Sequence, residues 1–121
     1  MADLSVRALI DSARMFGRVD PSAFASIVLL SDERLATLAG VPLDAVKNDP
    51  SAPAIQDFVL GAIAALEEAM IINPDESRVL QWFNSERLDT FAMKTPAEVV
   101  ADAQGDALVQ FIRSLESGST G

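Results

Sequence analysis

The sequence of 121 residues contains no cysteine and no histidine. The missing cysteine excludes disulfide bonds and thiolate metal sites, and it fits a reducing compartment. Together the two absences exclude the commonest transition-metal ligands, a Cys or His nucleophile or base, and any Ser-His-Asp triad. A phosphate-binding loop of the GxxxxGK[ST] kind is also missing. We therefore predict a protein that is not an enzyme and that holds no cofactor and no metal.

Long apolar runs are absent as well. No segment approaches the roughly twenty consecutive apolar residues that cross a bilayer. The N-terminus also lacks a basic segment followed by an apolar stretch and a cleavage site, which is the pattern of a secretory signal. These absences predict a soluble, cytoplasmic protein without a membrane partner.

Basic residues are scarce, with nine Lys and Arg against 18 Asp and Glu and a net charge of −9. Such a balance argues against binding nucleic acid by general electrostatic attraction. The first 18 residues differ, because they hold Arg7, Arg14 and Arg18 against only Asp3 and Asp11. Any contact with a polyanion is therefore expected to be local and near the N-terminus, although exposure to water alone also explains these arginines.

Apolar residues make up 50% of the chain and recur mostly at helical spacing. The longest periodic stretch, residues 53–71, is expected to be the central helix. No alternating pattern is long enough to predict a strand, although periodicity does not assign the short apolar runs 27–30 and 70–72. Further helices are expected at residues 3–16, from Pro21 through the run 24–30, at 31–39, at 42–48, around 79–83, at 96–103, and across 108–115. Gly17, Gly40 and Gly105 are expected to stop helices.

The sequence thus predicts an all-α fold, a compact bundle of about seven to eight helices. Residues 48–53 contain the turn formers Asp49 and Pro50 and are the predicted boundary between two parts. Residues 1–50 form a helix-turn-helix-like N-terminal part, residues 53–118 form the long helix with a small C-terminal module, and residues 119–121 form a tail.

The C-terminal module carries an ordered set of signals. They run from Val79-Leu80-Gln81-Trp82-Phe83 through Leu88, Lys94-Thr95-Pro96-Ala97-Glu98 and Gly105 to Leu115-Glu116-Ser117-Gly118. This order resembles the toxin-binding domain of Xre/MbcA/ParS-type antitoxins, over roughly residues 55–118. Two segments depart from that pattern: Asn84-Ser85-Glu86 replaces a turn with proline, and Phe91-Ala92-Met93-Lys94 replaces a glycine that often precedes the threonine.

The family places a helix-turn-helix upstream of this domain, and residues 24–48 have the matching shape. The segment 31–42 resembles the first helix and its glycine-containing turn, and residues 43–48 resemble the second helix. A helix that reads DNA offers cations and amides to phosphates and bases. Here Lys47 and Asn48 are the candidate DNA contacts, and they stand beside Asp44 and Asp49.

The resemblance implies a type II antitoxin that occludes the active site of a cognate toxin, most often an NAD-consuming enzyme of the RES type. The family's closing acid-x-glycine matches Glu116-Ser117-Gly118, so the candidate toxin-binding residues are Arg113, Glu116, Ser117 and Gly118. Trp82, Thr95-Pro96 and Gly105 are interpreted as structural residues.

Two alternatives stay open at this point. The chain can be a helix-turn-helix transcriptional regulator, including one that represses its own operon, and its apolar helix faces also favour a homo-oligomer.

The carboxylate pairs Glu67-Glu68 and Asp75-Glu76 are interpreted as a solvated acidic face, because neighbouring residues on a helix diverge by about 100° and do not converge on one point.

Overall fold

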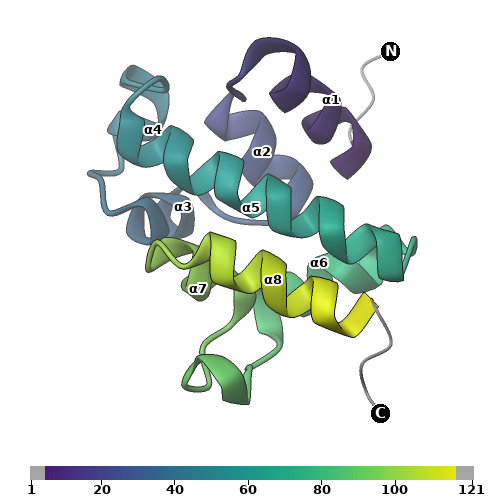
Figure 1. Ribbon diagram of the computed structural model, residues 1–121. Coiled ribbons are helices and arrows are strands. Elements are labelled where there is room, and N and C mark those ends of the chain that lie inside the picture. Colours follow the sequence, from purple (N-terminus) through teal and green to yellow (C-terminus); the bar gives the residue numbers. More distant parts are fainter. Residues whose placement is uncertain (1–4, 117–121) are drawn as a thin grey trace.

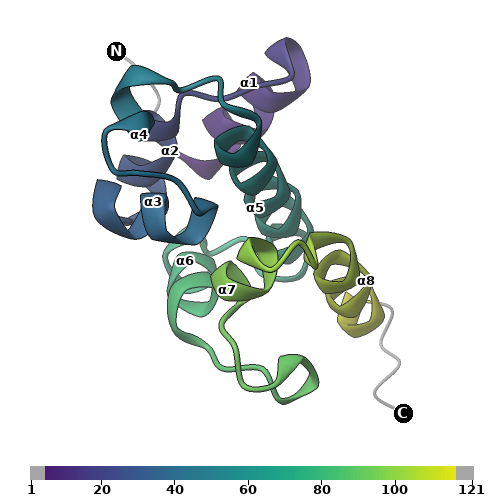
Figure 2. The ribbon, with the colours of Figure 1, turned by 90° about the vertical axis from the view of Figure 1, so that its left-hand side faces the viewer.

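The computed structural model describes residues 5–116, which form eight α-helices and one 3-10 helix. The long helix α5 lies at the centre, and α1 and α8 pack along different sides of it (Figure 1 and Figure 2). The predicted all-α class is confirmed. In chain order the elements are α1 Val6–Phe16, α2 Pro21–Val28, α3 Asp32–Ala39, α4 Ala45–Asn48, α5 Pro53–Ile72, α6 Glu76–Ser85, η1 Asp89–Phe91, α7 Pro96–Ala101 and α8 Gly105–Glu116.

Helix α5 is central because its apolar residues cover more than one face. Eight of its side chains are buried, and it contacts α1, α2, α3, α6, α7 and α8. A helix that is apolar on most sides has to be surrounded by other helices. One hydrophobic core therefore continues across the predicted boundary at residues 48–53 and joins the N-terminal and C-terminal parts. The division of the chain into an N-terminal part, residues 1–50, and a C-terminal part, residues 53–118, stays a prediction.

Polar side chains tie the short helices to this core. Gln56 on α5 accepts a hydrogen bond from the Val19 N–H and donates one to the Val19 carbonyl, at 3.0 and 2.8 Å. Asn84 on α6 donates to the Val28 carbonyl at the end of α2, at 2.8 Å. These bonds satisfy backbone N–H and C=O groups that have no partner within a helix. The chain therefore passes from one helix to the next without leaving those groups unpaired.

Most helix starts follow the sequence signals. Asp20, Ser31 and Thr95 each accept a hydrogen bond from the backbone N–H three residues later, and Pro21 and Pro96 occupy the first turn of their helices. Such caps satisfy N–H groups that have no partner inside the helix.

Several predicted boundaries were wrong. Gly105 does not stop a helix but begins α8, and the left-handed residue in that turn is Ala103, with φ 62°. The predicted helix 42–48 is only the single turn Ala45–Asn48, because residues 42–44 form hydrogen-bonded turns. Gly17 and Gly40 do end their helices, with φ 70° and 72°, a conformation that glycine adopts without steric cost.

Candidate protein-binding surface

An apolar groove of about 180 Å³ lies where the ends of α5, α6 and α8 converge. It is lined by Ala69, Ile72, Asn73, Arg78, Val79, Trp82, Ile112 and Leu115. Trp82 is half-buried: it packs against the core and also lines the groove. Leu115 and Ile72 remain 48% and 46% exposed, and Ile71 beside them is 57% exposed. This cluster of exposed apolar side chains makes the groove the candidate surface for contact with another molecule.

The turn after α5 shapes this groove. The Asn73 side-chain oxygen accepts a hydrogen bond from the Asp75 N–H at 3.0 Å, and Asp75 in turn caps α6 by accepting from the Arg78 N–H at 3.4 Å. The chain therefore reverses within three residues, and α6 packs back against α5. Helix α8 then lies alongside α5 over most of its length, so that Leu115 comes close to Trp82 across the groove.

The candidate residue Arg113 lies on α8, where it is held by an ion pair. Its Nε and Nη2 atoms contact the two carboxylate oxygens of Glu68 on α5, at 3.2 and 3.3 Å. This paired geometry suits a guanidinium facing a carboxylate, and the hydrogen bond to Glu68 raises the pKa of Arg113. Arg113 therefore positions α8 as well as facing solvent.

The other three candidate toxin-binding residues lie at or beyond residue 116, the last residue that the structure describes. Glu116 is exposed and is the last residue of α8, whereas Ser117 and Gly118 lie outside the described residues. Leu115 lies on the same face of this helix as the buried Leu108 and Ile112, yet it is 48% exposed. Leu115 and Arg113 lie two positions apart on α8, about 200° around the helix, so the groove side and the ion-pair side are different flanks.

Glu67 and Glu68 have a role that the sequence did not reveal. Glu67 pairs with Arg14 of α1, while Glu68 pairs with Arg113 of α8. Both carboxylates are largely covered, with exposed side-chain fractions of 29% and 15%. The interpretation as a solvated acidic face was wrong at this pair, because two adjacent carboxylates each hold a different helix against α5. The arginines of both pairs are more than half exposed, so each pair contributes little free energy. The main effect of the two pairs is to orient α1 and α8 on α5.

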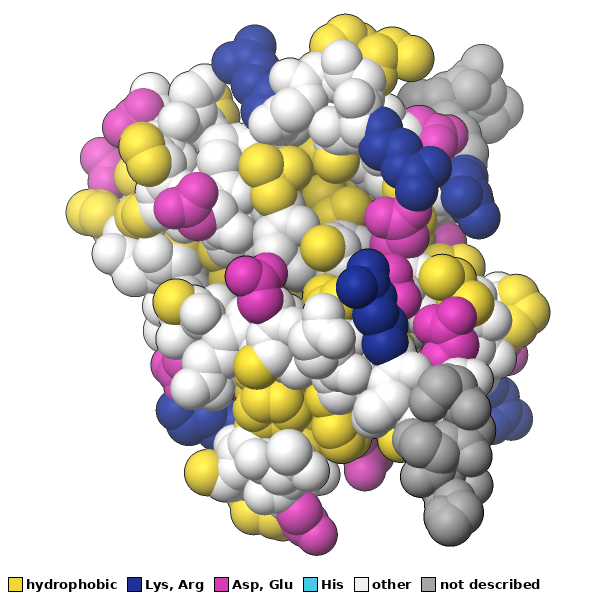
Figure 3. Space-filling view, in the orientation of Figure 1, with side chains coloured by type: hydrophobic (Ala, Val, Ile, Leu, Met, Phe, Trp, Pro, Cys, Tyr) yellow, Lys and Arg dark blue, Asp and Glu magenta, His cyan; other side chains and the backbone are white. Residues whose placement is uncertain are grey.

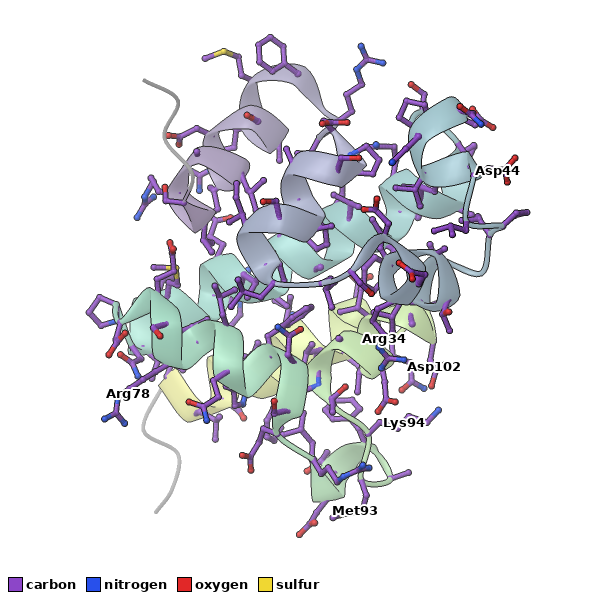
Figure 4. All side chains as sticks on the ribbon, turned by 180° about the vertical axis from the view of Figure 1, so that it is seen from behind. Arg34, Asp44, Arg78, Met93, Lys94 and Asp102 are labelled. Carbon is purple, nitrogen blue, oxygen red and sulfur yellow. The ribbon has the colours of Figure 1, made fainter. Side chains whose placement is uncertain are left out.

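The loop between α6 and α7 projects from the body of the molecule (Figure 1). It is closed by two hydrogen bonds: the Leu88 N–H donates to the Lys94 carbonyl at 3.0 Å, and the Met93 N–H donates to the Leu88 carbonyl at 2.9 Å. Phe91 packs edge-on against Phe111 of α8, with 5.7 Å between ring centroids. Ala92 and Met93 have positive φ, 59° and 65°. Figure 4 shows Met93 at the tip of this loop. The turn thus uses two residues in the left-handed region, where glycine has the lower energy.

Helix α7 begins with a capping box. The Thr95 N–H donates to the Glu98 carboxylate at 2.9 Å, and the Glu98 N–H donates to the Thr95 hydroxyl at 3.3 Å. The hydrogen bond from the Thr95 backbone, followed by lesser contributions from the Thr95 side chain and Arg34, lowers the pKa of Glu98. Arg34 of α3 lies 3.5 Å from Glu98, and Lys94 pairs with Asp102 nearby. Figure 4 shows Arg34, Lys94 and Asp102 gathered at this junction.

The candidate DNA contacts lie on a different corner, around α4. Helices α2, α3 and α4 contact one another, and the Gly40 turn joins α3 to the segment before α4. Lys47 and Asn48 are both exposed. Lys47 shares a shallow depression with Leu43, Asp32, Glu33 and Asp44, so its charge faces three carboxylates. Asp44 marks this corner in Figure 4. The local charge disfavours a phosphate backbone.

The described residues show neither a metal site nor a membrane-spanning helix, and comparisons with known proteins find no match. Within residues 5–116, no three acidic side chains come together in a way that would hold a metal ion, and no helix is both long and apolar enough to cross a membrane. Comparisons with protein-family models, with curated proteins and with solved structures find no match to this chain.

Proposed function

We propose that this chain is an antitoxin of a type II toxin-antitoxin system, and that it binds a cognate toxin through the groove between α5, α6 and α8 and through the adjoining end of α8. The observation that carries this proposal is the apolar groove itself, with Trp82 and Leu115 on its walls. The groove lies beside Glu116, one of the residues that the family resemblance assigns to toxin binding.

A backbone feature gives the resemblance further support. The antitoxin pattern often has a glycine before the threonine of Thr95-Pro96, and this chain has none there. Ala92 and Met93 nevertheless adopt the left-handed conformation that glycine favours. The segment before Thr95 thus keeps the left-handed backbone that a glycine would favour, although alanine and methionine stand there.

Charge and burial suggest how the antitoxin would act. An enzyme of the RES type consumes NAD, which is anionic, so its active-site cleft attracts negative charge. A partner with a net charge of −9 and an exposed carboxylate at Glu116 is electrostatically complementary to such a cleft. Apolar contacts in the groove would supply affinity, and the end of α8 would block the cleft sterically.

Co-expression with the product of the neighbouring reading frame tests the proposal. Leu115→Glu places a charge on the groove wall and should weaken the complex at least tenfold, since buried apolar anchors dominate binding energy. The matched control is Leu43→Glu, because Leu43 is 50% exposed and lies near α4, far along the chain from the groove. Circular dichroism of both variants checks that the helices are intact.

The expected result is a complex that survives Leu43→Glu and is lost with Leu115→Glu, together with a neighbouring product that inhibits growth only when the antitoxin is absent. The proposal is wrong if no complex copurifies and the neighbouring product is harmless when expressed alone.

The transcriptional regulator remains the second candidate, and one observation favours it: α2, α3 and α4 pack together as three short helices around the Gly40 turn. The carboxylates around Lys47 oppose it. A gel shift on the upstream DNA decides the point, since phosphate contacts make binding fall steeply with salt. Lys47→Glu should abolish any such shift, and a shift that survives this substitution would place the contact elsewhere.

A further inference from the structure

The free end of α1 carries two adjacent large apolar side chains that nothing in the described residues covers. Met15 and Phe16 are 74% and 69% exposed. Figure 3 shows hydrophobic side chains projecting at the top of the molecule, above a hollow that is also apolar. The left-handed Gly17 ends α1 directly after them, so helix geometry holds the two side chains on a projecting turn.

A groove of about 520 Å³ lies directly beside this projection, between α1, α2 and the turn at Pro50 and Ser51. Its walls are mainly apolar, and Phe16 forms part of its rim. The apolar part of the lining includes Ala8, Leu9, Val19, Pro21, Ala23 and Ile27. A projecting pair and a receiving groove therefore occur on one face.

The groove is preformed. Besides its two bonds to Val19, Gln56 donates a hydrogen bond to the Pro50 carbonyl at 2.8 Å, which fixes the position of this turn. Arg18 donates to the Ser51 hydroxyl at 3.0 Å from the other wall. Because these contacts already hold the walls in place, a side chain that enters the groove has little ordering to impose.

Charge indicates which occupant fits this face. The whole chain carries −9, so two copies repel over most of their surfaces. Residues 5–20 are less acidic than the rest: Arg7, Arg14 and Arg18 stand against Asp11 and Asp20, and Arg14 is already paired with Glu67 of α5. Arg18 and Asp20 both line the groove. In a twofold pairing each surface meets itself, so a face of mixed sign can place cation opposite carboxylate on both sides.

We propose that a second copy of this chain docks on the α1–α2 face, with Met15 and Phe16 of each copy entering the groove of the other. A projection beside a groove makes this surface self-complementary, and the twofold arrangement closes after two copies. This inference does not depend on the proposed toxin, because the groove that carries Leu115 belongs to other helices.

Sedimentation equilibrium over about 1 μM to 1 mM chain tests the dimer, with affinities read from the concentration dependence. The double variant Met15→Ser, Phe16→Ser removes the projection, and Ala23→Phe fills the groove while leaving the projection intact. Each is expected to weaken dimerisation at least tenfold. The controls Leu43→Ser and Met93→Ser remove apolar side chains elsewhere that are 50% and 49% exposed, and they should leave the dimer unchanged.

Mixing the two variants sharpens the test. A chain without the projection keeps every groove wall except the rim formed by Phe16, and a chain with a filled groove still has its projection, so one of the two contacts can form between them. The mixture should therefore associate more tightly than either variant alone, as measured with one chain carrying a fluorophore. Circular dichroism verifies that each variant is folded.

Three results would overturn the proposal. The first is a wild-type chain that stays monomeric over the whole concentration range. The second is a dimer that the double variant leaves unchanged, or a mixture that gains nothing over its components. The third is a monomeric chain whose Met15 and Phe16 variants lose binding to the neighbouring gene product, which would assign this face to that partner.

Discussion

Helices α5 and α7 approach each other closely at Gly61, where an added Cβ would lie 3.1 Å from the Val100 Cγ1 atom. Val100 is buried, and its methyl group would have to shift by a few tenths of an ångström to admit the new Cβ. Alanine in a helix interior is favoured over glycine by about 1 kcal/mol. Overpacking a buried site costs about 1–3 kcal/mol. We expect Gly61→Ala to lower the free energy of unfolding by about 1 kcal/mol, because the clash outweighs the gain in helix propensity.

A double-mutant cycle separates the two effects. Val100→Ala alone removes two buried methyl groups and should cost about 2 kcal/mol. In that background the atom that opposes the new Cβ is gone, so Gly61→Ala should stabilise the protein by about 1 kcal/mol. The expected coupling between the substitutions is therefore about 2 kcal/mol, well above the additivity error.

Urea unfolding followed by circular dichroism and by the fluorescence of Trp82, the single tryptophan, measures all four proteins. Gly105→Ala is the control, because its Cβ would lie 4.0 Å from the Gly61 Cα, an ordinary contact. This control should change stability by less than about 0.5 kcal/mol. If Gly61→Ala is equally destabilising with and without the Val100 methyl groups, the close approach does not limit the packing and the reasoning fails.

Three further predictions concern the supports of the fold. Asn84→Ala leaves the Val28 carbonyl without its side-chain donor and should lower the free energy of unfolding in urea by about 1–2 kcal/mol. Asn84→Asp should lower it more at pH 7, and stability should recover as pH falls and the carboxylate is neutralised. The depressed pKa of Glu98 means that its stabilisation is present above the unfolded carboxyl pKa of about 4.3 and is lost as pH falls through the lower folded value. Glu98→Gln should therefore cost about 0.5–1 kcal/mol at pH 7 and less at pH 3; an equal loss at both would contradict this. Ala92→Gly relieves a positive φ and should raise the thermal midpoint, while Ala101→Gly, at the last helical residue of α7, should lower it.

The helices were predictable because their signals are local. The period of apolar residues in 53–71 required a helix surrounded by others, and Thr95-Pro96 supplied both a cap and a first-turn proline. Gly105 was mispredicted since glycine is accepted both after a helix and at its start. The residue that takes the left-handed conformation, Ala103, has no local preference for it, so only tertiary packing selects it.

The candidate surface was less predictable because it depends on residues far apart in sequence. Arg113 was a candidate toxin-binding residue, and its pairing with Glu68, 45 residues away, requires α8 to lie along α5. The apolar stripe of α8 places Leu115 on the same face as Leu108 and Ile112, which are buried. A stripe, however, shows which side faces inward and not how far the neighbouring helices extend, and at the last turn of α8 they leave Leu115 half exposed.

The paired carboxylates of α5 connect the two proposed surfaces. Glu67 holds α1 through Arg14, and Glu68 holds α8 through Arg113, so both outer helices are fixed to the same turn of the central helix. In Figure 1 and Figure 2 these helices lie on different sides of α5. Self-association through α1 would therefore leave the groove beside α8 open in both copies. It follows that Leu115→Glu should abolish partner binding without changing dimerisation, and that the double variant at Met15 and Phe16 should do the reverse. A variant at either surface that impairs both activities would show that the two surfaces are not independent.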